Sequence, residues 1–142
     1  MITKTTAYKI YWAGRYLERI EDIARASLCA LHSNTSLDSL AKEYGLNSKE
    51  EIVIYIKKSF EFLREDIRGF ADESIMIQLN NLGFIIDSNY TDMESYFSSI
   101  LTSVMALGSS LDNYFVERKT EVRISSQEEN EPEEMRGKRN LT

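Results

Sequence analysis

The feature that most constrains this chain is an apolar pattern near its C-terminal end. From residue 93 to residue 114, apolar side chains recur at alternating steps of four and three, the spacing of heptad positions a and d: Met93, Phe97, Ile100, Val104, Leu107, Leu111 and Tyr114. Three heptads on one helix form a seam of the kind that packs in antiparallel bundles. Leu101, Met105 and Phe115 widen this seam, so we expect a helix near 92–117 to be central to the fold.

The rest of residues 1–117 carries the same helical signal. Apolar stripes with three- and four-residue steps predict helices near 6–32, 49–69 and 73–87, and a short helix is predicted near 37–44. The stripe of the first helix comprises Ile10, Ala13, Tyr16, Leu17, Ile20, Ala24, Leu28 and Leu31. Only 6 Gly and 1 Pro interrupt 142 residues. We therefore predict an all-α, single-domain antiparallel bundle of four main helices and one short helix.

Residues that cap helix N-termini precede the later segments. Ser36 stands before the short helix and Asp72 before segment 73–87. The pairs Ser48–Glu51 and Thr91–Glu94 have the spacing of capping boxes, in which Ser or Thr is the N-cap and Glu the third helical residue.

Beyond residue 117 the composition changes. Residues 118–142 contain an acidic block at 128–134 followed by a basic one at 136–139, with few apolar side chains. Such a segment cannot bury a core, so we predict a charged, largely disordered tail. Segments of this kind are solubilising appendages or, less often, docking segments.

Charge and hydropathy restrict the partners. With 17 Lys and Arg against 23 Asp and Glu, the formal net charge is −6, which disfavours a broad nucleic-acid or membrane surface. No window approaches the roughly 18 apolar residues of a membrane span. The N-terminus runs into a patterned helix rather than into a signal-peptide core, so we expect a cytoplasmic protein.

The sequence gives little support for a metal site or for a nucleophilic catalytic residue. A ferritin-like di-iron site needs Glu-x-x-His on two helices, whereas His32 is the one histidine. We interpret Cys29 as a small core hydrophobe and His32 as a residue of the last turn of the first helix. Neither a G-x-S-x-G elbow nor a Walker sequence occurs. We expect no metal site and no cofactor.

The first helix carries charged residues on the side opposite its apolar stripe: Arg15, Glu18, Arg19 and Asp22. Glu21 and Arg25 lie at the border with the stripe. This pattern indicates either a solvated face with ion pairs three and four residues apart, or a polar site. Gly14 lies inside the same helix at a cost of about 1 kcal/mol relative to Ala, which suggests close packing of another backbone.

The segment from Tyr11 to Arg25 reads Tyr-Trp-x-Gly-Arg-Tyr-Leu-Glu-Arg-x-Glu-x-x-Ala-Arg and resembles the opening helix of the alpha-E domain family, helical proteins known by an ER motif. The segment 64–68, Arg-Glu-Asp-Ile-Arg, followed by Gln-Leu-Asn at 78–80, resembles a second region of that family. The resemblance implies a place beside ATP-grasp-type ligases and transglutaminase-like proteins, which form peptide or amide bonds. It brings no established chemistry for the domain itself.

The two charged segments complement each other. We expect Glu18, Glu21 and Asp22 of the first helix to face Arg64 and Arg68 of the helix at 49–69. The arginines of the first helix, Arg15, Arg19 and Arg25, are available to pair with Glu61 and Glu65. The result is either a structural network between helices or a cleft that holds a carboxylate or phosphate. Three functions stay open: a non-catalytic accessory partner of an amide-forming system, which we favour, an enzyme or ligand-binding domain that uses this cluster, and a dimeric scaffold.

A homodimer is a further expectation. Members of the alpha-E family usually contain two related halves, each with such a helix, so pairing of two copies would restore the second half. Small residues beside the seam would permit close helix crossing: Ser99, Ser103, Ala106 and Ser110. We expect them to form an interface together with the Gly14 side of the first helix, in a twofold arrangement.

Overall fold

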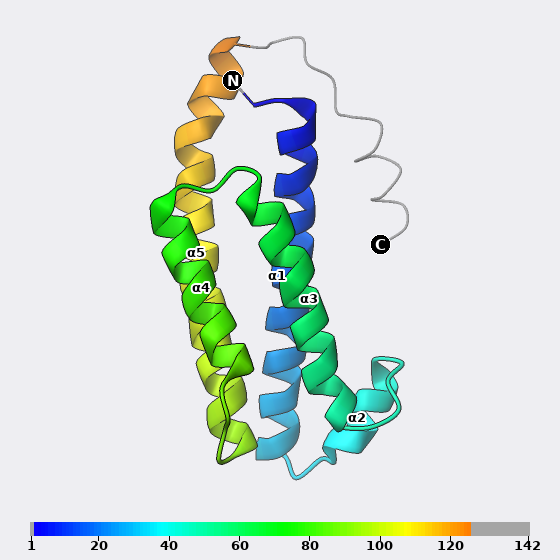
Figure 1. The fold of residues 1–142 in the computed structure, drawn as a ribbon. Helices are drawn as coiled ribbons and strands as arrows, with labels where there is room; N and C mark the ends of the chain where they lie inside the picture. The colour runs from blue at the N-terminus through cyan, green and yellow to red at the C-terminus, as the bar shows by residue number, and fades with distance from the viewer. Residues whose placement is uncertain (1, 126–142) are drawn as a thin grey trace.

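The computed structural model describes residues 2–125 of the chain, and side chains are described up to residue 116 (Figure 1). Five helices follow one another without a strand in this range: α1 (Lys4–His32), α2 (Leu37–Glu43), α3 (Glu50–Arg68), α4 (Glu73–Asp87) and α5 (Met93–Ser125). The predicted all-α fold with four main helices and one short helix is confirmed. Within residues 2–125, no helix is both long and apolar enough to cross a membrane.

The four long helices run alternately in opposite directions, and α2 lies beside the start of α3 at one end of the bundle (Figure 1). α1 packs against α3 and α5, while α4 packs mainly against α5 and less extensively against α3. The connections are short, as in up-and-down bundles. The side chains with almost no exposed surface come from all four long helices and include Ile20, Ile56, Leu63, Leu79, Leu82, Phe97 and Ile100.

Two of the predicted caps are confirmed. The Ser36 hydroxyl accepts hydrogen bonds from the backbone N–H groups of residues 38 and 39, and Asp72 accepts one from Ile75 at 2.9 Å. Thr3 caps α1 in the same way, because its hydroxyl accepts from the N–H of Thr6. Each bond satisfies an N–H that has no partner within its helix.

The two predicted capping boxes are wrong. At the start of α3, the side chain of Ser48 makes no capping bond: Asp38 of α2 accepts from the N–H of Lys49 at 2.8 Å, and Glu51 accepts from the N–H of Asn47 at 2.8 Å. At the start of α5, Asp92 rather than Thr91 is the cap, since it accepts from the N–H of Ser95 at 2.8 Å. In both places a carboxylate, a stronger acceptor than a hydroxyl, accepts from a backbone N–H at or just before the start of the helix.

The buried face of α1 is broader than its predicted stripe. Four residues outside the stripe are buried: Trp12, Ile23, Ser27 and Ala30. Four residues of the stripe are only half-buried: Ile10, Tyr16, Leu28 and Leu31. The reason is that α1 has α3 on one side and α5 on the other, so its contacts extend over both flanks. Cys29 is exposed, so its interpretation as a core residue is wrong.

The seam of α5 is confirmed, since Phe97, Ile100, Val104, Leu107 and Leu111 are all buried. The helix continues to Ser125, beyond the predicted end near 117, so residues 118–125 of the predicted tail are helical. Residues 126–142 of that tail lie outside the described residues.

Two tyrosine hydroxyls of α5 donate to backbone carbonyls, one in the last turn of α4 and one in the connection between α3 and α4. Tyr96 donates to the carbonyl of Ile86 at 2.8 Å, and Tyr114 donates to the carbonyl of Phe70, just before α4, at 2.9 Å. The carbonyl of Ile86 belongs to the last turn of α4 and has no partner within the helix, so Tyr96 satisfies it. Burial raises the pKa of Tyr96 to about 12.

Candidate functional site

The charged face of α1 is held by ion pairs within the helix. Arg15 lies 3.7 Å from Glu18 three residues later, and Arg25 lies 2.9 Å from Glu21 four residues earlier. Glu18 and Arg25 are largely exposed, with side-chain exposed fractions of 69% and 52%. Pairs of this kind contribute a few tenths of a kcal/mol to stability. The fold therefore depends little on these side chains.

An aromatic cluster lies beside this face, where α1 meets α3. The Tyr16 ring stacks on Phe62 of α3 with centroids 5.2 Å apart and planes 19° apart. Arg19 places its guanidinium carbon 5.0 Å from the centre of the Tyr16 ring. Trp12 lies at the buried side of the cluster, 5.8 Å from Tyr16. We call Trp12, Tyr16, Arg19 and Phe62 the aromatic ledge.

Phe62 was missed by the sequence analysis, although a signal was present. It follows Phe60 by two residues, and two residues on a helix span about 200°, so the two rings face nearly opposite sides of α3. Phe60 is buried in the core, whereas Phe62 has an exposed fraction of 54%. An aromatic residue away from the apolar stripe is a candidate for a contact outside the core.

The charged residues of α3 do not meet those of α1. Among the described side chains, no ion pair joins the two helices. The expected facing of Glu18 with Arg68 and of the α1 arginines with Glu65 is therefore wrong, and Glu65 and Arg68 are exposed. The border of the two helices is occupied by the stacked rings of Tyr16 and Phe62, which leaves the charges on the outer sides.

Arg64 faces α4 rather than α1. Its guanidinium carbon lies 4.8 Å from the centre of the Phe60 ring. One of its terminal nitrogens lies 3.0 Å from the position that a Cβ would occupy at Gly83 of α4. The Arg64 Nε is shielded from solvent and has no hydrogen-bond partner. The absence of a side chain at Gly83 thus makes room for Phe60 and Arg64 between α3 and α4.

Asp66 is a half-buried carboxylate near the end of α3. The pKa of Asp66 is raised to about 6, chiefly by burial, which outweighs the opposing effect of Lys9 of α1 and is aided by the nearby Glu65. The Lys9 side chain lies against Gly69 at the end of α3. The sequence does not predict this environment, because charge spacing along one helix does not reveal how far the neighbouring helix covers a residue.

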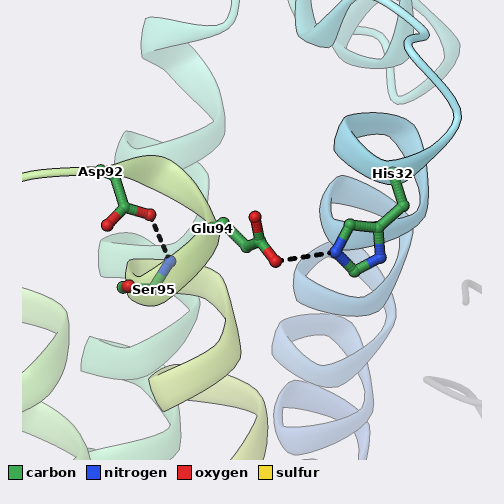
Figure 2. Close-up of polar contacts among 4 residues, drawn as sticks. All are labelled: His32, Asp92, Glu94 and Ser95. Atoms are coloured by element: carbon green, nitrogen blue, oxygen red, sulfur yellow. Dashed lines mark hydrogen bonds and ion pairs between the residues drawn. The ribbon is translucent and has the colours of Figure 1, made fainter.

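A polar contact joins the end of α1 to the start of α5 (Figure 2). His32 Nε2 lies 2.9 Å from Glu94 Oε1, and both side chains are more than half exposed. The backbone N–H of Ser95 holds the pKa of Asp92 below its ordinary value. His32 is the last residue of α1, as expected, with an acidic partner that the sequence analysis did not identify.

The expected interface residues divide between two faces. Ser99, Ser103 and Ala106 line a groove between α4 and α5, and the half-buried Ser110 lies one turn further along α5. Gly14 lies on α1, which does not contribute to that groove, and nothing lies within 4 Å of the position of a Cβ there. The idea that another backbone of the same chain packs closely on Gly14 is therefore wrong.

No group of three or more His, Cys, Asp or Glu side chains that could hold a metal ion occurs in the described part of the chain. None of the eight charged residues singled out from the sequence lines the groove between α4 and α5. What the α1–α3 side offers is an exposed surface that combines charged side chains of both signs with aromatic rings.

These features define a small all-helical bundle protein whose first helix presents an Arg- and Glu-rich face. A family model described as "a predicted alpha-helical domain with a conserved ER motif" matches residues 2–74, which contain α1, α2 and α3, and the chain belongs to this Alpha-E family. The Glu18-Arg19 pair of the ER motif lies at the aromatic ledge, where Arg19 covers Tyr16. No curated protein and no solved structure matches the chain.

Proposed function

We propose that this protein is a non-catalytic helical partner of an enzyme that forms amide or peptide bonds, of the ATP-grasp or transglutaminase-like class, and that it acts in the cytoplasm. One observation carries the proposal: the charged residues of the ER-motif helix pair within α1 and face solvent beside an exposed aromatic ring, instead of joining α1 to α3. The class of enzyme rests on the family resemblance of the motif.

The aromatic ledge has the chemistry of a protein contact. Arg and aromatic side chains dominate the binding energy of protein interfaces, because they combine a large apolar area with directed hydrogen-bond donors. Arg19 lies over Tyr16, so its rotamers are restricted before a partner arrives, which lowers the entropy lost on binding. Glu18 and Arg15 beside it would pair with groups of opposite charge and orient the partner.

The test is binding between the purified chain and a purified ATP-grasp ligase or transglutaminase-like enzyme encoded beside its gene, measured by isothermal titration calorimetry. We expect Arg19→Glu to weaken binding at least about tenfold, because the guanidinium is lost and the charge is reversed. Phe62→Ala should weaken it similarly, since more than half of that ring is exposed to a partner.

Lys57→Glu is the matched control. Lys57 is exposed on α3, five residues before Phe62 and on another side of the helix, and the substitution changes the net charge by the same amount as Arg19→Glu. Binding by Lys57→Glu should stay close to that of the unaltered chain. The proposal is wrong if neither enzyme class binds, or if Lys57→Glu and Arg19→Glu weaken binding equally.

A further inference from the structure

The middle of the outer face of α4 and α5 is free of charge, in a chain in which 28% of residues are charged. Neither residues 74–86 nor residues 95–111 contain an Asp, Glu, Lys, Arg or His. Helices that face water normally carry charged residues on their outer side. Here the outer side presents large apolar groups instead: Phe84 and Ile77 have exposed fractions of 79% and 55%.

The surface of this face is not flat. A groove with a volume of about 540 Å³ lies between the two helices and is lined by Asn81, Phe84, Ile85, Ser98, Ser99, Thr102, Ser103 and Ala106. A second hollow follows towards Tyr90 and Tyr96, and Phe84 and Ile85 line both. The Phe84 side chain therefore lies between the two hollows. The residues that line the groove on the α5 side are small. One face thus contains both a projecting ring and a space large enough to accept one.

We propose that this face binds a second copy of the chain in a twofold-symmetric dimer, in which Phe84 of each copy enters the groove of the other. A twofold interface brings the same patch of both subunits together, so the patch must be self-complementary. A ring beside a groove of small residues meets that condition. Two chains of net charge −6 also repel each other, and the repulsion is least where the contacting faces carry no charge.

A second copy suits this face better than the remainder of the same chain. Residues 126–142 contain eight charged residues, and burying charges against an uncharged groove without partners is costly.

The size of the face also sets the strength of the dimer. Seventeen residues of α5 extend about 25 Å, and two helices are about 20 Å wide, so each copy buries on the order of 500 Å². That area belongs to weak, concentration-dependent dimers.

Sedimentation equilibrium of the full chain between about 1 and about 300 μM tests the proposal, because this range covers dissociation constants of weak dimers. We expect the mass to rise from that of a monomer to that of a dimer across the range. Phe84→Asp and Ala106→Arg should each weaken dimerisation at least about tenfold, since each places a charge in the uncharged contact. Both residues are exposed, so the fold should survive, and circular dichroism checks this.

Met105→Arg is the matched control for Ala106→Arg. It lies next to Ala106 on α5, is 52% exposed and does not line the groove. It should leave dimerisation unchanged. A monomer at every concentration overturns the proposal, and so does a dimer that Met105→Arg disrupts while Ala106→Arg does not, because that dimer uses another side of α5. Neither outcome bears on enzyme binding by the aromatic ledge, which lies on α1 and α3.

Discussion

Two glycines inside helices have opposite surroundings. At Gly83, an added Cβ would lie 2.8 Å from the Phe60 ring and 3.0 Å from a nitrogen of Arg64. Phe60 is buried and cannot move aside without disturbing the core. At Gly14, nothing lies within 4 Å of the same position. Packing requires the first glycine, whereas the fold does not require the second.

The substitutions Gly83→Ala and Gly14→Ala should therefore change stability in opposite directions. Gly83→Ala gains helix propensity but overpacks the contact with Phe60, so we expect the free energy of unfolding to fall by about 1 kcal/mol. Gly14→Ala gains propensity without a clash, so it should rise by roughly 0.5–1 kcal/mol. Urea denaturation of both variants measures this. A stabilising Gly83→Ala would contradict the described packing between α3 and α4.

Asp66 should make stability depend on pH. Its pKa is raised from 3.8 to about 6 in the folded protein. The folded state then binds this proton more tightly than the unfolded chain. The resulting stabilisation is fully present below about pH 4 and is lost as the pH rises through about 6.

Asp66→Asn removes this titration. We expect it to raise the melting temperature by a few degrees at pH 7.5, where the half-buried carboxylate is charged, and to change it little at pH 4. Glu61→Gln is the control, because Glu61 is exposed on the same helix, does not contribute to the pKa shift of Asp66, and should show no such difference between the two pH values. Equal effects of Asp66→Asn at both pH values would contradict the assigned environment.

At the scale of the element, helix existence could be predicted and helix starts only in part. The prediction of α5 rests on seven apolar positions, so one atypical residue does not change it. A helix cap depends on which of several nearby acceptors bonds one backbone N–H. Asp38, remote in sequence, takes an N–H near Ser48, and Asp92 displaces Thr91 from the next residue. Local spacing does not contain that information.

Contacts between helices were harder still to predict. Complementary charges on α1 and α3 favoured an ionic network, yet the helices meet through aromatic rings. A sequence assigns a charged residue to one side of its own helix, but the rotation of the neighbouring helix decides whether the two sides meet. The expected network between α1 and α3 is therefore absent from the described ion pairs, and the charged residues of α1 pair within their own helix.

Double-mutant cycles distinguish the two kinds of contact. Tyr16→Ala and Phe62→Ala should couple by about 0.5–1.5 kcal/mol, the range for stacked aromatic pairs. Glu18→Ala and Arg68→Ala should be additive within about 0.3 kcal/mol, because no ion pair joins them. Chemical denaturation of the single and double variants provides the comparison. Coupling of the charged pair with additivity of the aromatic pair would reverse our assignment.

On the scale of the whole molecule, charge is distributed unevenly. The α1–α3 side carries the paired and exposed charges of the ER-motif helix, whereas residues 74–86 of α4 and 95–111 of α5 carry none. Two proposed contacts of the same protein should therefore respond differently to salt.

Raising sodium chloride from about 0.05 M to about 0.5 M should weaken enzyme binding by the aromatic ledge, because exposed charge pairs are screened. The same change should leave the dimer unchanged or strengthen it, since screening reduces the repulsion between two chains of net charge −6. Calorimetry and sedimentation equilibrium at both salt concentrations measure the two responses. A dimer that weakens strongly with salt would indicate a charged interface.

The two tyrosine hydroxyls of α5 have a consequence for how the bundle opens. Tyr96 bonds the C-terminal end of α4 to α5, whereas Tyr114 bonds the connection between α3 and α4 at Phe70. Its contact with α3 is less extensive. Native-state hydrogen exchange should consequently show the α4–α5 hairpin as one cooperative unit that separates from α3 before it comes apart itself.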